Sequence, residues 1–212
     1  AVLKSDATDQ GDGGKVIVWS ADTTKAYGRI SAKGGGGSGK GGFVETSGKQ
    51  SLSVDGIRVN TLGSGGMGKW LLDPASFIVA HVSGGDITDT TINTNLQTTN
   101  VVVNAAGDIV FNDDTVAIAF PISYSYGSLT FSAGGDIYLR GSITNDNYAV
   151  VPFSSVTLNA GGRIITPPGA NLTLGGLYQL DVQVANGKTW DNYGTINVGG
   201  MADIDLDTGT PA

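Results

Sequence analysis

The side chains of this chain that could do chemistry are mainly carboxylates: 18 Asp and one Glu, Glu45, accompany a single His, His81, and no Cys. A serine or cysteine nucleophile needs a neighbouring base, and a zinc site needs several nitrogen or thiolate ligands. One imidazole without any thiol supplies neither. We therefore expect His81, which follows the apolar run Phe-Ile-Val-Ala, to be a structural residue at a strand edge or on an outward face, and the chain not to be an enzyme.

Two groups of charged residues are candidates for binding a cation or an acidic polysaccharide. Asp113 and Asp114 are adjacent, and Asp136, Arg140 and Arg163 fall in neighbouring sequence repeats. Adjacent strand residues point to opposite faces of a sheet, however, and Asp is common in turns, where it accepts hydrogen bonds from nearby backbone N–H groups. We interpret these side chains as turn residues, and the sequence assigns no acid and base pair of a glycosidase.

Near the end of the chain, the sequence Asp-Ile-Asp-Leu-Asp-Thr-Gly is a candidate calcium site. Asp203, Asp205 and Asp207 would lie on one face of a strand, with Ile204 and Leu206 on the other, so their carboxylates could hold Ca²⁺. The Gly falls one position later than in a calcium loop, and no bidentate Glu follows. A solvated final strand with its apolar side inward is the favoured interpretation.

Two other features have both a functional and a structural interpretation. Tyr124 and Tyr126 alternate with small polar residues, so they could stack on sugar rings or on a receptor, or cover the side of the molecule. The Asp73-Pro74 bond is acid-labile and is a cleavage point in some exported proteins. We interpret it as a turn, because Pro fixes φ after the apolar run Trp-Leu-Leu.

Composition predicts strands and turns. The chain has 34 Gly among 212 residues, and Asp, a turn and cap residue, replaces Glu, a helix former. The net charge of -7 argues against nucleic acid, whose affinity for proteins comes largely from Lys and Arg. No apolar run is long enough to span a bilayer, so we expect no membrane insertion. The Gly-rich segment 34–42 lacks the spacing of a phosphate-binding loop and is expected to be a flexible outward loop.

Internal repeats are the main architectural signal. In the first part of the chain, short alternating apolar segments follow Gly at a step of about 14 residues. Further on, units such as Leu-Thr-Phe-Ser-Ala-Gly-Gly-Asp-Ile recur at a step of about 27 residues, so one coil would hold two of the shorter units. We expect the repeat glycines to form turns that need positive φ. These glycines are Gly14, Gly28, Gly42, Gly56, Gly107, Gly135 and Gly162.

Stacked coils would bury one face of each strand, which a short strand pair cannot do alone. The sequence therefore predicts an all-β protein, a right-handed parallel β-helix or β-solenoid, with an antiparallel β-sandwich as the alternative fold. Val102, Phe131 and Leu158 are expected to stack behind one another. The three Trp residues are expected in the core or in stacking contacts. The second predicted ladder comprises Ile109, Ile137 and Ile164.

One domain spans residues 1–212. We expect Gly-rich coils with the shorter repeat step in 1–80, and coils with the longer step in 101–212. The connector 81–100 between them departs from the strand pattern. Within it, two apolar residues four apart behind a Thr or Asp cap predict a short helix near 89–98, with an irregular loop as the alternative.

Four motifs in order, together with the later Ala-Gly-Gly-Asp-Ile units and the stretch from Ile92 to Val103, make most of residues 13–165 resemble the filamentous-haemagglutinin-like exoproteins of two-partner secretion. The four motifs are Gly13-Gly-Lys-Val-Ile-Val-Trp-Ser20, Gly28-Arg-Ile-Ser-Ala32, Gly41-Gly-Phe-Val-Glu-Thr-Ser-Gly48 and Gly68-Lys-Trp-Leu-Leu-Asp-Pro74. The resemblance implies a β-helix exported through an outer-membrane transporter to the surface of a Gram-negative bacterium. It also implies a role in adhesion, aggregation, haem acquisition or toxin delivery, of which we favour surface adhesion and aggregation, or a role in the biofilm matrix. The Asn-rich secretion domain of such proteins is not visible in this sequence.

Three classes of function follow from these observations. The favoured one is a secreted structural and adhesive segment, which could also bind copies of itself end to end into filaments because uncapped solenoid ends expose backbone N–H and C=O groups. The second is a binding module for a host glycan or protein. A carbohydrate-active β-helix enzyme is the third.

Overall fold

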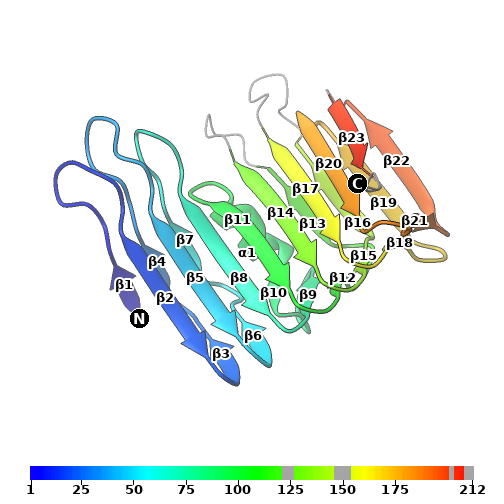
Figure 1. The fold of residues 1–212 in the computed structure, drawn as a ribbon, viewed down its shortest axis with the longest axis horizontal. Helices are drawn as coiled ribbons and strands as arrows, with labels where there is room; N and C mark the ends of the chain where they lie inside the picture. Colours follow the sequence, from blue (N-terminus) through cyan, green and yellow to red (C-terminus); the bar gives the residue numbers. More distant parts are fainter. Residues whose placement is uncertain (121–126, 146–153, 201–202, 208–212) are drawn as a thin grey trace.

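The computed structural model describes residues 1–120, 127–145 and 154–200, together with the backbone of 203–207. It is a right-handed parallel β-solenoid of about seven turns, with 50% of residues in strands and 4% in its one helix (Figure 1). All strand pairs in the described part are parallel, which confirms the predicted fold and excludes the antiparallel sandwich.

Each turn of the chain crosses three faces. The first face is an eight-stranded sheet, the second carries a two-stranded and a six-stranded sheet, and the third carries a three-stranded and a four-stranded sheet. The first face comprises β2 (Lys15–Ser20), β5 (Phe43–Gly48), β8 (Lys69–Pro74), β11 (Asn100–Ala105), β14 (Ser128–Ala133), β17 (Ser155–Ala160), β20 (Gln179–Val184) and β23 (Asp203–Asp207). The second comprises β3 (Thr23–Lys25) and β6 (Ser51–Ser53), then β10 (Ile87–Thr88), β9 (Phe77–Ala80), β12 (Ile109–Phe111), β15 (Ile137–Tyr138), β18 (Ile164–Thr166) and β21 (Trp190–Asn192). The third comprises β1 (Val2–Lys4), β4 (Arg29–Ser31) and β7 (Arg58–Asn60), then β13 (Ala117–Ala119), β16 (Gly141–Thr144), β19 (Asn171–Gly175) and β22 (Thr195–Gly199).

The register gives the length of each coil. Lys15 pairs with Phe43, and Leu129 pairs with Val156, so these two coils are nearly equal in length. The coil from Val156 to its partner Leu180 is shorter. The smaller repeat step of the sequence is therefore half a coil. Its glycines precede, in turn, strands of the first face and strands of the third face.

Apolar side chains on alternate residues of most of the described strands form a continuous core. Ile109, Ile137 and Ile164 stack as predicted. Phe131 and Leu158 also stack, but their partner is Val103, and Val102 points outward beside Thr130. The prediction was wrong by one residue. Because residues 101–103 are all Val, the alternation of apolar and polar residues does not show which of them point into the core. Phe131 also meets the ring of Phe111 edge to face, with centroids 5.4 Å apart.

The three Trp residues have different environments. Trp70 is fully buried, and its indole N–H donates to Thr46 Oγ1 at 2.9 Å. Trp190 packs partly buried against the core, and its indole donates to Thr166 Oγ1 at 3.1 Å. Trp19, however, is 59% exposed, so its predicted core position is wrong. It alternates with the inward-facing Val18 and therefore lies on the outer face of β2.

The repeat glycines have a different role from the predicted one. Gly28 and Gly56 do have positive φ, of 99° and 76°. The other five do not, and the expectation of positive φ was wrong for them. They are Gly14, Gly42, Gly107, Gly135 and Gly162. Stacked turns approach so closely that a Cβ would collide with the neighbouring coil: one on Gly42 would lie 2.0 Å from the carbonyl oxygen of Gly14.

Gly-rich loops also stack on the edge between the third and first faces. Segment 34–42 does project outward, but backbone hydrogen bonds tie it to both neighbouring loops. Gly35 N–H donates to the carbonyl of Gly11 at 2.8 Å, and Gly41 N–H donates to that of Gly66 at 2.9 Å. The segment is therefore the middle layer of an ordered stack.

The predicted helix is present as α1 (Asp89–Asn95), with Thr88 as its N-cap. It packs against β7 and β13, so it fills the gap between the three-stranded and four-stranded sheets of the third face (Figure 1). Ile92 and Leu96, the two apolar residues four apart, are both fully buried. In the third turn a helix thus takes the place of a strand.

Two asparagines of α1 replace the backbone of the missing strand. Asn95 Oδ1 accepts from Val59 N–H at 2.6 Å, and its Nδ2 donates to the carbonyl of Ile57 at 3.0 Å. On the other side of the helix, Asn93 Oδ1 accepts from Ala119 N–H at 2.9 Å, and its Nδ2 donates to the carbonyl of Ala117, also at 2.9 Å. Each side chain has a donor and an acceptor at the spacing of a peptide group, so strands on both sides are satisfied.

Candidate functional surfaces

A cavity of about 500 Å³ lies on the outer surface of the third face, over β1, β4 and β7. We call it the basic groove because four cationic side chains line it. These are Lys4, Arg29, Lys33 and Arg58, with Asp6 as the one acid. Strand alternation explains the lining: the inward residues Ile30 and Val59 are buried in the core, so their neighbours face solvent.

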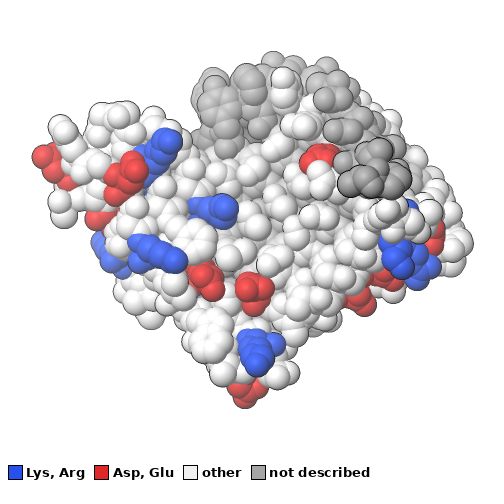
Figure 2. Space-filling model, in the orientation of Figure 1, with Lys and Arg blue, Asp and Glu red and all other residues white. Residues whose placement is uncertain are grey.

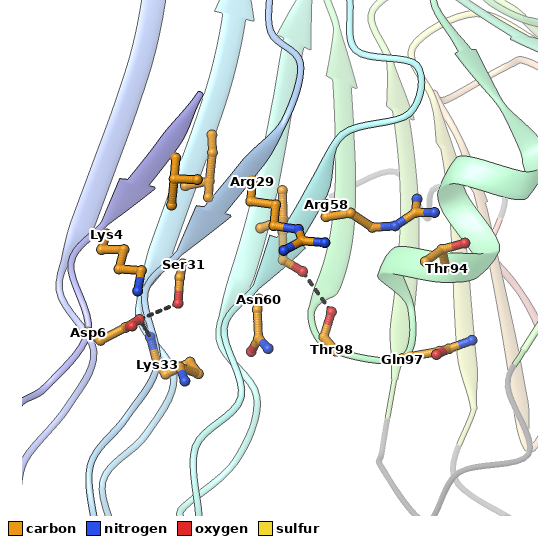
Figure 3. A pocket seen from close by; sticks show the side chains of 13 residues that line it. Lys4, Asp6, Arg29, Ser31, Lys33, Arg58, Asn60, Thr94, Gln97 and Thr98 are labelled. Carbon is orange, nitrogen blue, oxygen red and sulfur yellow. Dashed lines mark hydrogen bonds between the residues drawn. The ribbon is translucent and has the colours of Figure 1, made fainter.

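The groove exists because a helix interrupts the sheet. Thr94 of α1, with Gln97 and Thr98 just beyond it, lines the cavity on the side away from β1 (Figure 3). A strand in the same position would continue the sheet as a flat surface. The wall is fixed to the floor, since Thr98 Oγ1 donates to the carbonyl of Val59 at 2.6 Å.

Arg29 and Arg58 are direct register partners on neighbouring parallel strands. Adjacent strands are about 4.8 Å apart, and like charges directly opposite each other are destabilising. Figure 3 shows both guanidinium groups extending along the groove toward Thr94. Neither arginine takes part in an ion pair with another described residue. The pair is thus a concentrated positive charge without a carboxylate to balance it in the described structure.

Asp6 does not neutralise the arginine pair because its own carboxylate is already engaged. Asp6 Oδ1 accepts from the hydroxyl of Ser31 and, at 2.8 Å, from the N–H of Lys33. Partial burial acts to raise the pKa of Asp6, but these hydrogen bonds and the charges of Lys33 and Lys4 hold the pKa below its ordinary 3.8. The carboxylate is therefore ionised at neutral pH and is hydrogen-bonded at the lysine end of the groove.

The groove belongs to a positively charged part of an acidic chain. Residues 1–69 contain nine of the 12 Lys and Arg but six of the 19 acidic residues, a net charge of +3. Residues 70–212 have a net charge of -10. Because the coils follow one another along the axis, charge changes sign along the solenoid.

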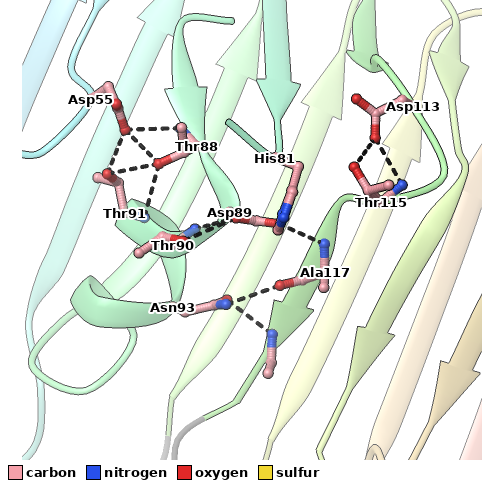
Figure 4. Close-up of polar contacts among 11 residues, drawn as sticks. Asp55, His81, Thr88, Asp89, Thr90, Thr91, Asn93, Asp113, Thr115 and Ala117 are labelled. Atoms are coloured by element: carbon pink, nitrogen blue, oxygen red, sulfur yellow. Dashed lines mark hydrogen bonds and ion pairs between the residues drawn. The ribbon is translucent and has the colours of Figure 1, made fainter. Parts of the chain in front are cut away.

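A second polar cluster surrounds the start of α1 (Figure 4). His81 Nδ1 and Asp89 Oδ2 are 2.8 Å apart, and the same carboxylate oxygen accepts from Ala117 N–H at 2.8 Å. Asp89 is 2% exposed, whereas the His81 side chain is 45% exposed. The hydrogen bond from Asp89 and its negative charge raise the pKa of His81 above the ordinary 6.5. His81 therefore lies at the solenoid surface, as predicted, but its acidic partner was not predicted.

The neighbouring carboxylate of Asp55 anchors the helix to the previous turn. Its Oδ1 accepts from Thr88 N–H at 3.1 Å, from the Thr88 hydroxyl at 2.5 Å and from the Thr91 hydroxyl at 2.6 Å (Figure 4). Partial burial acts to raise the pKa of Asp55, but these hydrogen bonds lower it below 3.8. All the donors are backbone or Thr groups around the N-cap, so the role of Asp55 is positional.

Asp113 and Asp114 lie between β12 and β13, in the turn that was predicted. Asp113 Oδ1 accepts from Thr115 N–H at 2.8 Å, and the bonds from Thr115 lower the pKa of Asp113 below 3.8. Asp114 Oδ1 instead accepts from the N–H of Asn171 at 3.3 Å. The two carboxylates thus have separate partners.

The structure brings together two of the three residues in the other predicted charged group. Asp136 Oδ1 accepts from Arg163 N–H at 2.7 Å, and the Arg163 guanidinium bridges Asp136 at 3.3 Å and Asp191 at 3.1 Å. Ion pairs among the described residues do not include Arg140. Asp136, Arg163 and Asp191 come from successive coils, so their charges alternate along the stacked turns. These contacts stabilise the turns, as expected of Asp residues there.

Asp73 and Pro74 are the last two residues of β8, where they pair with Ser47 and Gly48. The predicted turn at this bond is wrong. Pro is tolerated because it comes at the end of the strand. Partial burial and the negative charge of Glu45 raise the pKa of Asp73 above 3.8.

The remaining candidates are only partly described. Asp203, Asp205 and Asp207 are in β23, whose register places Ile204 opposite the core residue Leu180. This confirms the strand; the positions of its side chains lie outside the described residues, so the calcium site stays a prediction. Tyr124 and Tyr126 also lie outside them. In the described part, no group of three or more His, Cys, Asp or Glu could hold a metal ion.

The basic groove and the two asparagines of α1 were not predicted from the sequence. A signal for the groove did exist, because the separation of Arg29 and Arg58 in the chain is close to one coil length. The coil length alone would have predicted that the two arginines stack. The sequence would not have predicted the wall formed by the helix, because only packing shows which face α1 interrupts.

Together these surfaces define the class of protein: a parallel β-solenoid with one helix-bounded basic groove and otherwise local, structural polar networks in its described part. Comparison with models of protein families, with curated proteins and with solved structures gave no significant match. No helix among the described residues is long and apolar enough to cross a membrane.

Proposed function

We propose that this chain is a non-catalytic, structural and adhesive segment of a two-partner-secretion exoprotein, displayed outside a Gram-negative cell. An outer-membrane transporter would be its partner during export. Its roles would be surface adhesion, aggregation or support of a biofilm matrix. The proposal rests on the solenoid itself, together with the resemblance of residues 13–165 to filamentous-haemagglutinin-like proteins.

The observation that carries the proposal is the unbroken parallel sheet of the first face. Eight strands in register over about seven turns give a rod in which each coil is hydrogen-bonded to the next through this face. Such a rod resists bending and leaves few unpaired backbone groups for a protease. Stiffness of this kind is useful for holding a contact surface away from a cell.

The outer surface of the first face offers a broad contact area. Its central strands present uncharged polar side chains outward, and Figure 2 shows a wide area without charge there. Examples are Thr130, Ser132, Thr157 and Asn159. A flat polar sheet can form many weak hydrogen bonds to a glycan or protein surface, which is the requirement for multivalent adhesion.

Adhesion is tested with latex beads coated with the purified chain and incubated with epithelial cells and with abiotic surfaces. Coated beads should be retained well above beads coated with albumin, and digestion of the chain by trypsin should be slow under the same conditions. Retention equal to that of albumin beads would contradict the adhesive role. Rapid digestion would contradict the structural one.

End-to-end self-association is a further part of the proposal. In the described part, β2 and β23 each pair on one side only, and unpaired strand edges can recruit another chain. The positive charge of residues 1–69 and the negative charge of residues 70–212 favour a head-to-tail arrangement. Electron microscopy and light scattering of the 212-residue chain should show rods that lengthen with concentration and shorten in 0.5 M salt, roughly where the Debye length falls well below 10 Å. A monodisperse particle of one chain at all concentrations would refute it.

A further inference from the structure

We propose that the basic groove binds a carboxylated saccharide, with Arg29 and Arg58 holding its carboxylate and the helix-side wall contacting its hydroxyl groups. The inference does not depend on the adhesive role: it concerns one site and its ligand. It starts from an arrangement that the fold does not need. Two arginines face solvent as direct partners on β4 and β7 and contribute nothing to the core.

The arginine pair is electrostatically unfavourable without a ligand. The ion pairs of the described residues lie elsewhere on the solenoid: Arg163 lies between two aspartates, and His81 contacts Asp89. Arg29 and Arg58 instead lie beside each other, and the one carboxylate lining the groove, that of Asp6, is bonded to Ser31 and Lys33. An anion bound between the two guanidinium groups would remove the repulsion.

A carboxylate fits the geometry of this pair. Guanidinium is a planar fork that matches a carboxylate with two parallel hydrogen bonds. With strands about 4.8 Å apart, two such forks can share one carboxylate or hold acids on successive units of a chain. Figure 3 shows both groups extending in the same direction along the groove, with the Arg58 guanidinium nearer Thr94 and the Arg29 guanidinium behind it.

The rest of the lining suits sugar hydroxyls. Amide and hydroxyl side chains surround the arginines, and Gln97 makes no side-chain hydrogen bond with another described residue. A small apolar contact comes from Val2, which lines the groove and is 60% exposed. A groove of about 500 Å³ has room for a short oligosaccharide. Nucleic acid is disfavoured because no aromatic side chain lines the groove for a base to stack on.

Binding is measured by isothermal titration calorimetry with tetragalacturonate and, as the matched neutral ligand, its fully methyl-esterified form. The wild-type chain should bind the acid at least tenfold more tightly than the ester. Arg29→Gln and Arg58→Gln should each weaken acid binding by at least tenfold. Arg58→Lys keeps the charge but not the fork, and should cause an intermediate loss.

Lys49→Gln is the control variant, since it removes one positive charge from the turn between β5 and β6, outside the groove. It should bind like the wild type. Circular dichroism confirms that each variant is folded before titration. Equal binding of acid and ester, no binding of the acid, or an equal loss in Lys49→Gln would overturn the proposal. Competition by inorganic phosphate as strong as that of tetragalacturonate would show a simple anion site and would overturn the assignment to a saccharide.

Discussion

Asn95 should be among the most important polar residues for stability, because it completes the edge of β7 where the next coil has no strand. The side chain is 1% exposed and satisfies Val59 N–H and the Ile57 carbonyl. In Asn95→Ala both backbone groups remain buried without a partner. Each such group costs about 1–3 kcal/mol, so we expect a loss of about 4 kcal/mol.

Asn93 provides the matched control on the other side of the same helix. It makes the same two contacts to β13, but the site is partly exposed, so water can replace the lost groups. Asn93→Ala should therefore cost less than about 1 kcal/mol. Asn95→Leu, which keeps the volume without the hydrogen bonds, should be nearly as destabilising as Asn95→Ala.

Amide hydrogen exchange gives the most direct assay because it reports on each strand edge separately. The Val59 amide should exchange at least about 100-fold faster in Asn95→Ala, a change that corresponds to about 2.8 kcal/mol of local opening, while the Ala119 amide is unaffected. Asn93→Ala should accelerate Ala119 and leave Val59 unchanged. Equal exchange of Val59 in the wild type and in Asn95→Ala would refute the reasoning that the asparagine substitutes for a strand.

Three other predictions follow from particular contacts. Gly42→Ala should lower the free energy of unfolding, measured by chemical denaturation, by about 3 kcal/mol, since the new Cβ would overlap a carbonyl oxygen of the previous turn. Gly36→Ala is the control: the atom nearest to its new Cβ is 3.5 Å away, so the free energy of unfolding should change by less than about 0.5 kcal/mol. The pKa of His81 is raised, so its contact with Asp89 should stabilise the fold fully below pH 6.5 and lose this effect as the pH rises through the folded-state pKa. In an NMR titration Asp89→Asn should return the pKa of His81 toward 6.5, and an unchanged value would contradict the assigned cause. Arg58→Gln should raise the melting temperature at low salt by removing repulsion from the stacked arginine, and the gain should vanish at high salt; a loss of stability at low salt would show that the two charges are not in conflict.

Much of the architecture could be predicted from the residues in order. Recurrence of Ala-Gly-Gly-Asp-Ile and its near matches, Ala-Ala-Gly-Asp-Ile and Ala-Gly-Gly-Arg-Ile, at one coil length is enough to predict stacked parallel strands. Stacking coils at that spacing buries the recurring inward apolar residue. The Ile109 ladder and the helix with Ile92 and Leu96 inward follow from periods of two and 3.6 residues. These periodicities are local, and they predict the packing correctly because each coil makes the same contacts with its neighbours as the coil before it.

Where the local pattern was ambiguous, tertiary packing decided. Three valines in a row do not show whether 102 or 103 points inward, and Trp19 is exposed because its neighbours on β2 already face the core. The reason for the turn glycines is also tertiary. Gly42 is needed because the turn that contains Gly14 lies so close to it, rather than for its own φ.

The basic groove shows the same division. Sequence alone determined that the chain is an acidic solenoid with few groups for catalysis, and it placed Arg29 and Arg58 close to one coil length apart. Tertiary structure alone decided that these arginines are neighbours, that Asp6 is occupied elsewhere, and that α1 raises a wall beside them. The physical reason is that coil length varies, since the coil that begins at Val156 is shorter than the one that begins at Lys15, and insertions such as α1 shift the register. The groove is built from residues of several coils, so it depends on how these coils stack. No single segment of the sequence shows that stacking.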